Sequence, residues 1–345
     1  MVSITPTTAA PPTALTFAFT GDILSHTPLI DQAKRTAIAN STAETQLDYD
    51  FRPMFLDIKP LISGVDIAVC HLETAIAPEG EELSTYPFFG VPKEITTAIA
   101  DAGFDRCSTA SNHTYDRGND GIDATVNALQ DVGIEQSGMA RTPDEIEPKV
   151  FEVKGIKLCH LSYTFSYNGL IMPDETQWRS AIINTKRILR DAKRARELGS
   201  QATIISMHWG TEKDSNANSM QTSIADELTA SGLVDLIEPD HRICPELGLL
   251  PTPGHTPGHV SICIESKGEK AIITGDMMHH PIQLERPGQL ARFDMDGKVA
   301  CNTRVSFVER VANSGTFVIG SHFNEPTGGY VVRDAHGCRL QQNQQ

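Results

Sequence analysis

The stretch VDIAVCHLET, residues 65–74, sets the pattern from which the fold can be predicted. Its first part, Val65–Cys70, is a short apolar run of the kind that makes a buried β-strand. The run is followed by His71–Leu72–Glu73, in which Glu73 is the candidate functional residue. Strand ends are where α/β folds collect functional side chains, because the sheet holds them rigidly while the ends stay open. The stretch therefore predicts a strand with functional residues at its carboxyl end.

Runs of the same kind lie on both sides of this stretch. Further strands are predicted at Leu15–Thr20, Ile156–Tyr163, Ala202–Met207, Val260–Glu265, Ala271–Thr274 and Thr316–Ile319. Helices are predicted at Pro92–Ala102, Gly121–Gln130, Gln177–Leu198 and Thr303–Ala312. The alternation of the two predicts an α/β protein. Residues 1–14 are rich in Thr, Pro and Ala and are expected to form a loose arm.

The composition excludes several classes of function. The 345 residues include 39% hydrophobic and 21% charged side chains, which is typical of a folded globular protein. A formal net charge of -15 disfavours binding to nucleic acid or to an anionic membrane surface. No apolar stretch reaches the roughly 20 residues of a membrane span, and no signal peptide is predicted. The seven scattered cysteines predict reduced thiols, and together these features predict a cytoplasmic protein.

Several segments before residue 242 carry side chains that bind metal ions. They are GDILSH (21–26), CHLET (70–74), SNHTYDRG (111–118), HWGTE (208–212) and PDH (239–241). Carboxylate, amide oxygen and imidazole groups together suit Zn, Mn or Fe. Such a set can hold one or two ions that lower the pKa of a bound water. The candidate ligands are Asp22, Glu73, Asn112, His208 and His241.

Each of these residues also has a structural explanation. Asp22 could cap a helix, Asn112 could be a turn residue, and His208 could be a packed core histidine. Their joint placement at predicted strand ends favours a metal site. His113, beside Asn112, could then protonate a leaving group.

A second set of candidate ligands follows residue 248. The motif LLPTPGHTPGHVSI (249–262) presents His255 and His259 just before a predicted strand. The segment AIITGDMMHH (271–280) ends a strand on Asp276, and FVIGSHF (317–323) ends another on His322. Histidine, carboxylate and histidine from three strand ends predict a partial zinc site.

The larger part of the chain resembles the capsule-synthesis CapA/PgsA family, which itself is similar to calcineurin-like metallophosphatases. The resemblance covers about residues 15–237 and rests on GDILSH, DYDFRPMF, CHLETAIAP, STASNHTYDRGNDGI, LSYTFSYNG and SMHWGTE. It implies a four-layer α/β/β/α sandwich. It also implies that Asp22, Glu73, Asn112 and His208 bind metal and that His113 is a general acid. The family's Gly-His-x-x-His segment is missing, because residues 238–243 read EPDHRI here.

Residues 238–338 resemble the C-terminal half of the metallo-β-lactamase superfamily, especially its lactonase and organophosphate-hydrolase-like members. The resemblance implies that His259 and His322 each bind one ion and that Asp276 bridges two. It also implies that His279 and His280 line the pocket. The superfamily's His-x-His-x-Asp-His segment is absent, since the sequence contains no His-x-His pair.

The two resemblances meet near Ile237–Glu238, and each lacks ligands that its family takes from the other end of the chain. Residues 15–237 and 238–342 are therefore expected to form either a composite of two half-folds or two separate domains. A half-fold that stands alone exposes a sheet face, which would favour a homo-oligomer.

The leading hypothesis is a metal-dependent hydrolase of a phosphoester, lactone or related ester. Its substrate would be a small molecule or an anionic polymer, and its cofactor a divalent metal, with Zn preferred over Mn or Fe. His113 or Asp276 would handle the proton. Two alternatives stay open: a non-catalytic factor in capsule or poly-γ-glutamate synthesis, and an inactive hybrid with incomplete metal sites.

Overall fold

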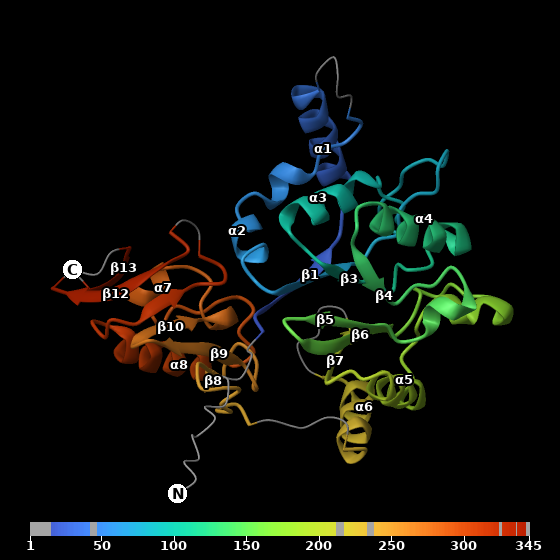
Figure 1. Cartoon of the computed structure of the whole chain (residues 1–345). Coiled ribbons are helices and arrows are strands. Elements are labelled where there is room, and N and C mark those ends of the chain that lie inside the picture. The colour runs from blue at the N-terminus through green and yellow to red at the C-terminus, as the bar shows by residue number, and fades with distance from the viewer. Residues whose placement is uncertain are drawn as a thin grey trace, which may run out of the picture. The chain divides into compact units, whose positions relative to one another are not determined.

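The computed structural model describes residues 15–41, 47–211, 217–232, 238–323, 326–335 and 337–342. The predicted arm at residues 1–14 lies outside the described residues. The chain divides into two compact units, which are described separately (Figure 1). The N-terminal unit comprises Met1–Gly210 and Met220–Leu233, and the C-terminal unit comprises Thr211–Ser219 and Val234–Gln345. Both units mix helices and strands, so the predicted α/β class is confirmed.

The first sheet of the N-terminal unit has four parallel strands in the order β1-β2-β3-β4. Their bounds are β1 (Phe17–Ile23), β2 (Ile67–Leu72), β3 (Arg106–Ser108) and β4 (Glu135–Ser137). The predicted strands at Leu15–Thr20 and Val65–Cys70 are confirmed, each ending two or three residues later than predicted. Because all four strands run the same way, their carboxyl ends lie at one edge of the sheet.

The second sheet of this unit has the order β5-β6-β7. Its strands are β5 (Val150–Val153), β6 (Ile156–Thr164) and β7 (Ala202–His208). β5 pairs with β6 in the antiparallel sense, whereas β6 and β7 are parallel. The predicted strands at Ile156–Tyr163 and Ala202–Met207 are therefore confirmed, and His208 is the last residue of β7.

Among the described residues, six α-helices belong to the strand-to-strand connections of this unit and to the segment after β7. They are α1 (Thr27–Asn40), α2 (Lys59–Ile62), α3 (Glu94–Ala102), α4 (Gly118–Asp131), α5 (Thr185–Glu197) and α6 (Ser219–Ala230). In the view of Figure 1, α3 and α4 lie above the first sheet and α5 lies below the second. Gly103 closes α3, and its φ of 97° is a conformation that glycine adopts easily.

One predicted helix is too long. Helical periodicity predicts Gln177–Leu198, but α5 begins only at Thr185, after the Asn184 side chain accepts a hydrogen bond from the Arg187 N–H. Ser180 forms an isolated bridge with Met139, and Ile182 forms one with Thr164. This strand-like pairing with distant residues overrides the local helical pattern.

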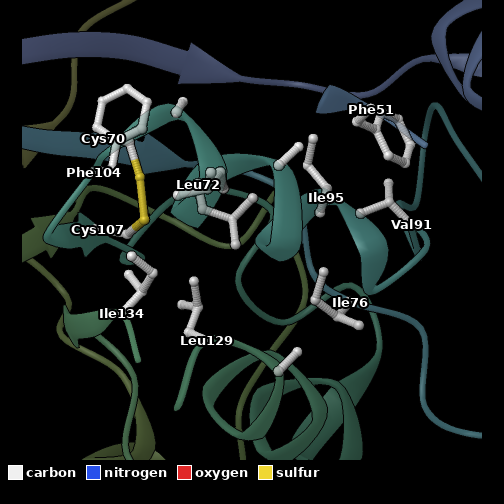
Figure 2. Close-up of a cluster of buried hydrophobic side chains, with 14 of the residues drawn as sticks. Phe51, Cys70, Leu72, Ile76, Val91, Ile95, Phe104, Cys107, Leu129 and Ile134 are labelled. Carbon is white, nitrogen blue, oxygen red and sulfur yellow. A yellow bond between two sulfur atoms is a disulfide. The ribbon is translucent and has the colours of Figure 1, made fainter. Parts of the chain in front are cut away.

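The two faces of β2 pack against different elements. Alternate residues from Ala68 to Leu72 pack against α3 and α4 in a large hydrophobic cluster (Figure 2). The residues between them, Ile67 and Val69, pack against Leu158 of β6. Helices thus cover one face of the first sheet, and the second sheet contacts the other face. A third cluster joins β6 to α5 through residues such as Leu161 and Ile188.

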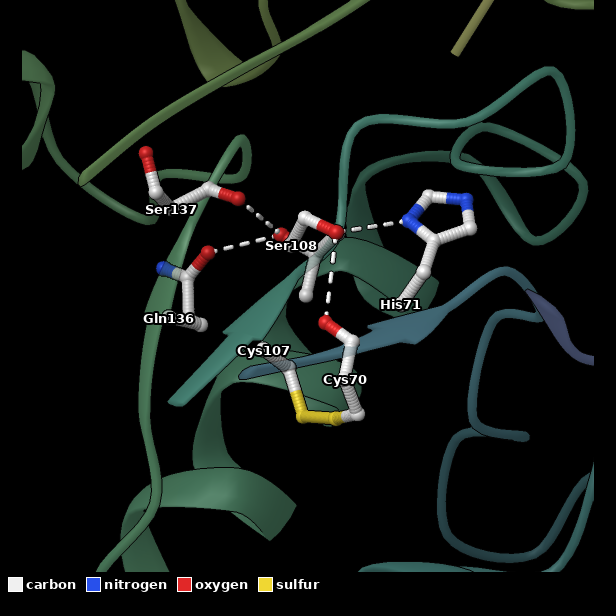
Figure 3. The surroundings of a disulfide bond; sticks show 7 residues. Cys70, His71, Cys107, Ser108, Gln136 and Ser137 are labelled. Carbon is white, nitrogen blue, oxygen red and sulfur yellow. Dashed lines mark hydrogen bonds between the residues drawn. A yellow bond between two sulfur atoms is a disulfide. The ribbon is translucent and has the colours of Figure 1, made fainter. Parts of the chain in front are cut away.

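The prediction that the cysteines are uniformly reduced is wrong for one pair. Cys70 and Cys107 form a disulfide between neighbouring strands (Figure 3). They are register partners in the parallel pairing of β2 with β3, which places their Cα atoms 4.6 Å apart. Because 37 residues separate the two cysteines in sequence, their proximity could not be predicted from their spacing. The other described cysteines are free: Cys159, Cys244, Cys263, Cys301 and Cys338.

The C-terminal unit is built on one six-stranded sheet with the order β13-β12-β11-β10-β9-β8. The strands are β8 (Leu247–Pro251), β9 (Val260–Ser266), β10 (Glu269–Ile273), β11 (Phe317–Ile319), β12 (Gly328–Asp334) and β13 (Gly337–Gln341). Only the pairing of β10 with β11 is parallel among the five pairings. The helices are α7 (Ile282–Glu285) and α8 (Gly297–Val311).

The core of this unit lies between its sheet and its helices, where Phe307 and Val311 of α8 pack with Val318 of β11. The three predicted strands of this region are confirmed, but α8 begins six residues before the predicted start at Thr303. Asp296 sets this earlier start, because its carboxylate accepts the N–H groups of Lys298 and Val299.

None of the helices in the described ranges combines the length and the apolar character that crossing a bilayer requires.

Candidate metal centres

The space between the two sheets of the N-terminal unit changes from apolar to polar along the strands. Near the strand starts, Ile67 and Val69 of β2 pack against Leu158 of β6. His71 follows Val69 by two residues, and alternation along a strand places both on the same face. β7 of the second sheet ends on His208. The polar side chains therefore gather where the strand-end pattern predicts them.

Three strand ends bring metal-ligand side chains together. Asp22, His71 and His208 each offer one ligand atom, and these atoms lie within 4.8 Å of one another. His71 Nε2 lies 3.9 Å from Asp22 Oδ1, and the rings of His71 and His208 stack with centroids 5.0 Å apart. The three side chains line a cavity of about 240 Å³. Asp22 and His71 come from the first sheet and His208 from the second, so both sheets supply the site.

The hydrogen bonds of His71 fix which ring nitrogen faces this cavity. The Ser108 hydroxyl donates to the carbonyl of Cys70 at 3.2 Å, so its oxygen accepts the Nδ1–H of His71 at 2.8 Å (Figure 3). Nε2 then carries the lone pair. This atom is buried and has no hydrogen-bond partner among the described residues.

Burial keeps both imidazoles neutral. Burial, and then the neighbouring His208, lower the pKa of His71 to about 4. Burial also lowers the pKa of His208. A neutral imidazole is the form that binds a metal ion. One carboxylate and two neutral imidazoles form a donor set that fits zinc.

Three further predicted residues surround this cluster. Glu73 Oε1 lies 3.9 Å from His208 Nε2 and 4.0 Å from His113 Nε2. His208 Nε2 donates a hydrogen bond to Asn112 Oδ1 at 3.1 Å. Asp116 Oδ2 lies 2.7 Å from His113 Nδ1 and so holds that ring from its other side. Glu73, Asn112 and His113 are all buried, so these contacts form in a protected environment.

His160 lies in the same layer and makes the stability of the unit depend on pH. Burial lowers its pKa to about 3, whereas the ordinary value of 6.5 applies when the chain unfolds. Below pH 6.5 the unfolded chain therefore binds a proton that the folded chain does not. We expect the free energy of unfolding to fall, by up to about 1.4 kcal/mol per pH unit for this one proton, as pH drops from 6.5 toward 3.

Urea unfolding of the full chain at several values between pH 7 and pH 4.5 measures this dependence. His160→Gln should show a shallower slope than the wild type, and the exposed His26→Gln should keep the wild-type slope. An unchanged slope in His160→Gln would contradict the assignment of a neutral buried imidazole.

The C-terminal unit contains a second group of metal-ligand side chains. His255, His279 and Asp294 offer ligand atoms that lie within 4.8 Å of one another. Among the described residues, His255 Nδ1, His279 Nδ1 and Asp294 Oδ1 are buried without a hydrogen-bond partner. The other oxygen of Asp294 accepts a hydrogen bond from the buried Arg304 at 3.0 Å.

The ligands that the sequence predicts for this unit bond to one another. His322 Nε2 lies 2.8 Å from Asp276 Oδ1. The backbone N–H of Asp276 donates to His259 Nε2 at 2.9 Å, so that lone pair is already engaged. His259 Nδ1 lies 2.8 Å from Thr252 Oγ1. Asp276 Oδ2 also lies 3.6 Å from His255 Nε2, which joins the predicted residues to the second group.

His241, another predicted ligand, is not a member of the second group. It is exposed in the segment before β8, and its carbonyl accepts the N–H of Leu249 at 2.8 Å. In the described ranges its side chain makes no hydrogen bond, ion pair or ring contact with the second group.

Four members of the two groups, His71, His255, His279 and Asp294, are not among the predicted ligands. His71 could have been selected, because it precedes the predicted ligand Glu73 by two residues at the same strand end. His255 and His279 lie in the motifs at residues 249–262 and 271–280, but neither is predicted to bind a metal ion. Asp294 offered no signal, because it lies in an irregular segment before α8.

Comparison with known proteins gives two family matches. Residues 16–241 match the family described as bacterial capsule synthesis protein PGA_cap. Residues 197–329 match the metallo-beta-lactamase superfamily. A search of curated proteins finds no match.

Among solved structures, the hydrolase AbOPH of the beta-lactamase superfamily is 22% identical, with a TM-score of 0.31 over 36% of this chain and 46% of that one. The chain thus spans about half the length of that protein. AidC, a dizinc quorum-quenching lactonase, is 14% identical with a TM-score of 0.33, covering 80% of this chain and 76% of AidC. A probable metal-dependent hydrolase from Staphylococcus aureus is 13% identical with a TM-score of 0.32, covering 80% and 79%.

The first family match covers well over half of the chain. It includes the strand ends that carry Asp22, His71 and His208. The chain therefore belongs to the bacterial capsule synthesis protein family PGA_cap.

Proposed function

We propose that the N-terminal unit is a metal-dependent hydrolase of phosphoester or related ester bonds. The observation that carries the proposal is the convergence of Asp22, His71 and His208, with the lone pair of His71 Nε2 buried and unmatched. A buried polar atom without a partner requires an explanation, and a divalent ion between these three side chains would supply one. Zinc fits the donor set of one carboxylate and two imidazoles, and Mn or Fe could also occupy it.

The residues of the site would have separate roles. Asp22, His71 and His208 would hold the ion, whose chemistry is to lower the pKa of a bound water for attack at phosphorus or carbonyl carbon. Asn112 and Glu73 contact His208 and would fix its orientation.

His113 is the proposed proton donor to the leaving group. Asp116 lies 2.7 Å from its Nδ1, so the ring is held with Nε2 directed away from Asp116. Nε2 lies 4.0 Å from Glu73 Oε1, on the side of the metal ligands. A positioned histidine of this kind transfers protons in general acid catalysis.

For the C-terminal unit we propose a second, weaker ion site. His259, Asp276 and His322 stay the proposed ligands there, with Asp276 as a proton handler for a lactone or related ester. Ion binding would require two hydrogen bonds to break. One joins Asp276 to His322, and the other runs from the Asp276 N–H to His259 Nε2. These competing bonds are the reason to expect weaker binding than in the N-terminal unit.

We also propose a four-layer α/β/β/α sandwich for residues 15–237, with residues 238–342 as a separate metallo-β-lactamase-like part. In its support, one hydrophobic cluster joins helices to the first sheet, one joins the two sheets, and one joins the second sheet to α5. A cytoplasmic location stays a prediction, and it would require Cys70 and Cys107 to be reduced in the cell.

A second candidate function is a non-catalytic role in capsule or poly-γ-glutamate synthesis. Membership of the PGA_cap family favours it, because the description of that family names capsule synthesis. Tight binding of an anionic polymer without turnover would select this candidate over the hydrolase.

Metal content and hydrolysis by the full chain test the proposal. We expect the purified wild type to carry at least one ion, measured by elemental analysis, and to hydrolyse a chromogenic phosphodiester. His71→Ala and His208→Ala should each lose one equivalent of ion and about 100-fold or more in rate, since loss even of an outer partner of a ligand costs 10- to 100-fold.

His26→Ala is the matched control, because His26 is exposed and outside the group. It should keep both the ion and the rate. If His71→Ala and His208→Ala kept both as well, the proposal would be wrong. If the wild type held no ion after reconstitution, the result would favour the alternative that the chain is an inactive hybrid with incomplete metal sites.

A further inference from the structure

Arg106 is a buried cation in the layer between the two sheets. It lies on β3 and is 5% exposed. Its neighbour Cys107 packs into the cluster on the helix-covered face, so alternation turns Arg106 toward the second sheet. There its guanidinium carbon lies 4.2 Å from the ring centroid of Phe151 on β5. A charge in such a place is costly unless it is matched.

In the described parts of the chain, the ring of Phe151 gives this charge a cation–π contact but no hydrogen-bond acceptor. Within them Arg106 makes no side-chain hydrogen bond or ion pair, and its Nε is fully buried without a partner. Burial lowers the pKa of Arg106, and Glu135 and Asp105 offset this effect only in part. Asp105 Oδ2 is already bonded to the N–H of Ala68 at 2.8 Å. The guanidinium therefore has hydrogen-bonding capacity to spare.

Arg106 lines a cavity of about 60 Å³ together with His160 and Ser162 of β6. Three carboxylates also line this cavity, and each is already paired with an arginine: Glu145 with Arg141, Glu147 with Arg194, and Asp191 with Arg190. The unmatched charge of Arg106 therefore makes its part of the wall positive.

Two polar groups stand beside Arg106 in the cavity wall. Ser162 Oγ accepts the N–H of Ala110 at 3.2 Å, which leaves its own hydrogen to be donated. His160 is 3% exposed, and its Nδ1 has no partner in the part of the chain that the structure describes. A guanidinium, a hydroxyl and an imidazole nitrogen together form a polar lining that needs an occupant.

We propose that this cavity binds a small oxyanion, a phosphate or carboxylate group, on Arg106. Its volume of about 60 Å³ is roughly four to six times the 10–15 Å³ that one water needs, which suits an anion of four or five heavy atoms. The planar guanidinium binds such groups through paired hydrogen bonds. Ser162 also lines the cavity of Asp22, His71 and His208, so the two cavities share a wall. The proposal goes beyond the hydrolase, because Arg106 is not among the proposed metal ligands.

Titration of inorganic phosphate into the metal-stripped full chain, followed by calorimetry, tests this site. We expect saturable binding to the wild type. Arg106→Met should weaken it by roughly 10- to 100-fold, the range for one charge-assisted hydrogen bond. Arg52→Met is the matched control, because Arg52 pairs with Asp50 and does not line the cavity, and it should bind as the wild type does.

Two variants keep the test decisive if Arg106→Met fails to fold. Arg106→Lys keeps the charge but loses the paired N–H donors of the planar guanidinium. Ser162→Ala removes a hydroxyl donor. Both variants should therefore bind phosphate less tightly. The His208→Ala chain should still bind phosphate, which separates this site from the proposed metal centre. Absence of saturable binding to the wild type, or wild-type affinity in Arg106→Lys and Ser162→Ala, would overturn the proposal.

Kinetics of the metal-loaded chain distinguish the two sources of the anion. If the site holds the charged end of a substrate, Arg106→Lys raises KM for an ester with a carboxylate tail and leaves KM for a neutral ester unchanged. If the site holds a free anion, both KM values stay the same while phosphate affinity still falls. Either result, together with the phosphate titration, supports the oxyanion site.

Discussion

Replacing His113 with Gln should lower kcat by about 100- to 10,000-fold and leave the metal content unchanged. His113 is not one of the three residues whose ligand atoms converge, so the ion should remain. Its Nε2 lies 4.0 Å from Glu73 Oε1, beside the cluster, and its Nδ1 is anchored 2.7 Å from Asp116 Oδ2. Glutamine can fill the space but cannot transfer a proton at neutral pH. Steady-state hydrolysis and elemental analysis of the same preparation measure both quantities.

Asp116 supplies the companion variant for this prediction. Its side chain is fully buried, and Oδ2 also accepts the N–H of Phe89 at 2.7 Å. Asp116→Asn should keep the ion and lose part of the rate, because the carboxylate that orients His113 is gone. Wild-type kcat in His113→Gln would remove His113 from the proposed reaction, and loss of the ion in that variant would instead make it a ligand.

The strand-end rule predicted much of the N-terminal site from sequence. It selected Asp22 and His208, which the fold brings together from different sheets. It passed over His71, although the apolar run that predicts β2 is followed directly by His71. The sequence pattern thus identifies which side chains lie at strand ends. The packing of the two sheets against each other decides which of these side chains come together. That second step depends on contacts such as Val69 on Leu158, which no local pattern records.

Contacts between residues far apart in sequence limited the prediction elsewhere. His259 and Asp276 stay predicted ligands, but motif order did not reveal that the Asp276 N–H donates to His259 Nε2. The Cys70–Cys107 disulfide arises from strand register, which the spacing of cysteines does not reveal. The start of α5 was also missed, because pairing of Ser180 with Met139 competes with helical periodicity. In each case a tertiary contact decided between options that were locally equivalent.

A fully buried ion pair joins α8 to the segment before it in the C-terminal unit. The side chains of Arg304 and Asp294 are 0% and 1% exposed, with Nη2 3.0 Å from Oδ2. Arg304 Nε also donates to the carbonyl of Pro287 at 3.1 Å, and Nη1 to that of Met277 at 3.2 Å. Burial raises the pKa of Asp294, but the hydrogen bonds from Arg304 and from the Ala291 N–H, together with the charge of Arg304, outweigh burial, so the pKa is lowered. The pair therefore stays charged and holds three segments around one guanidinium.

Breaking this pair should destabilise the C-terminal unit by about 3–5 kcal/mol, because the remaining partner is a buried uncompensated charge. Asp294→Asn and Arg304→Met should each do so, while the exposed Arg310→Met on the same helix should change little. Hydrogen–deuterium exchange of the full chain separates the units: peptides of α8 and β10 should lose protection, and peptides of β2 and α3 should keep it. The double variant Asp294→Leu with Arg304→Met should recover part of the loss, since apolar residues can replace a buried pair. Equal protection of α8 in Asp294→Asn and the wild type would mean that the pair does not stabilise this unit.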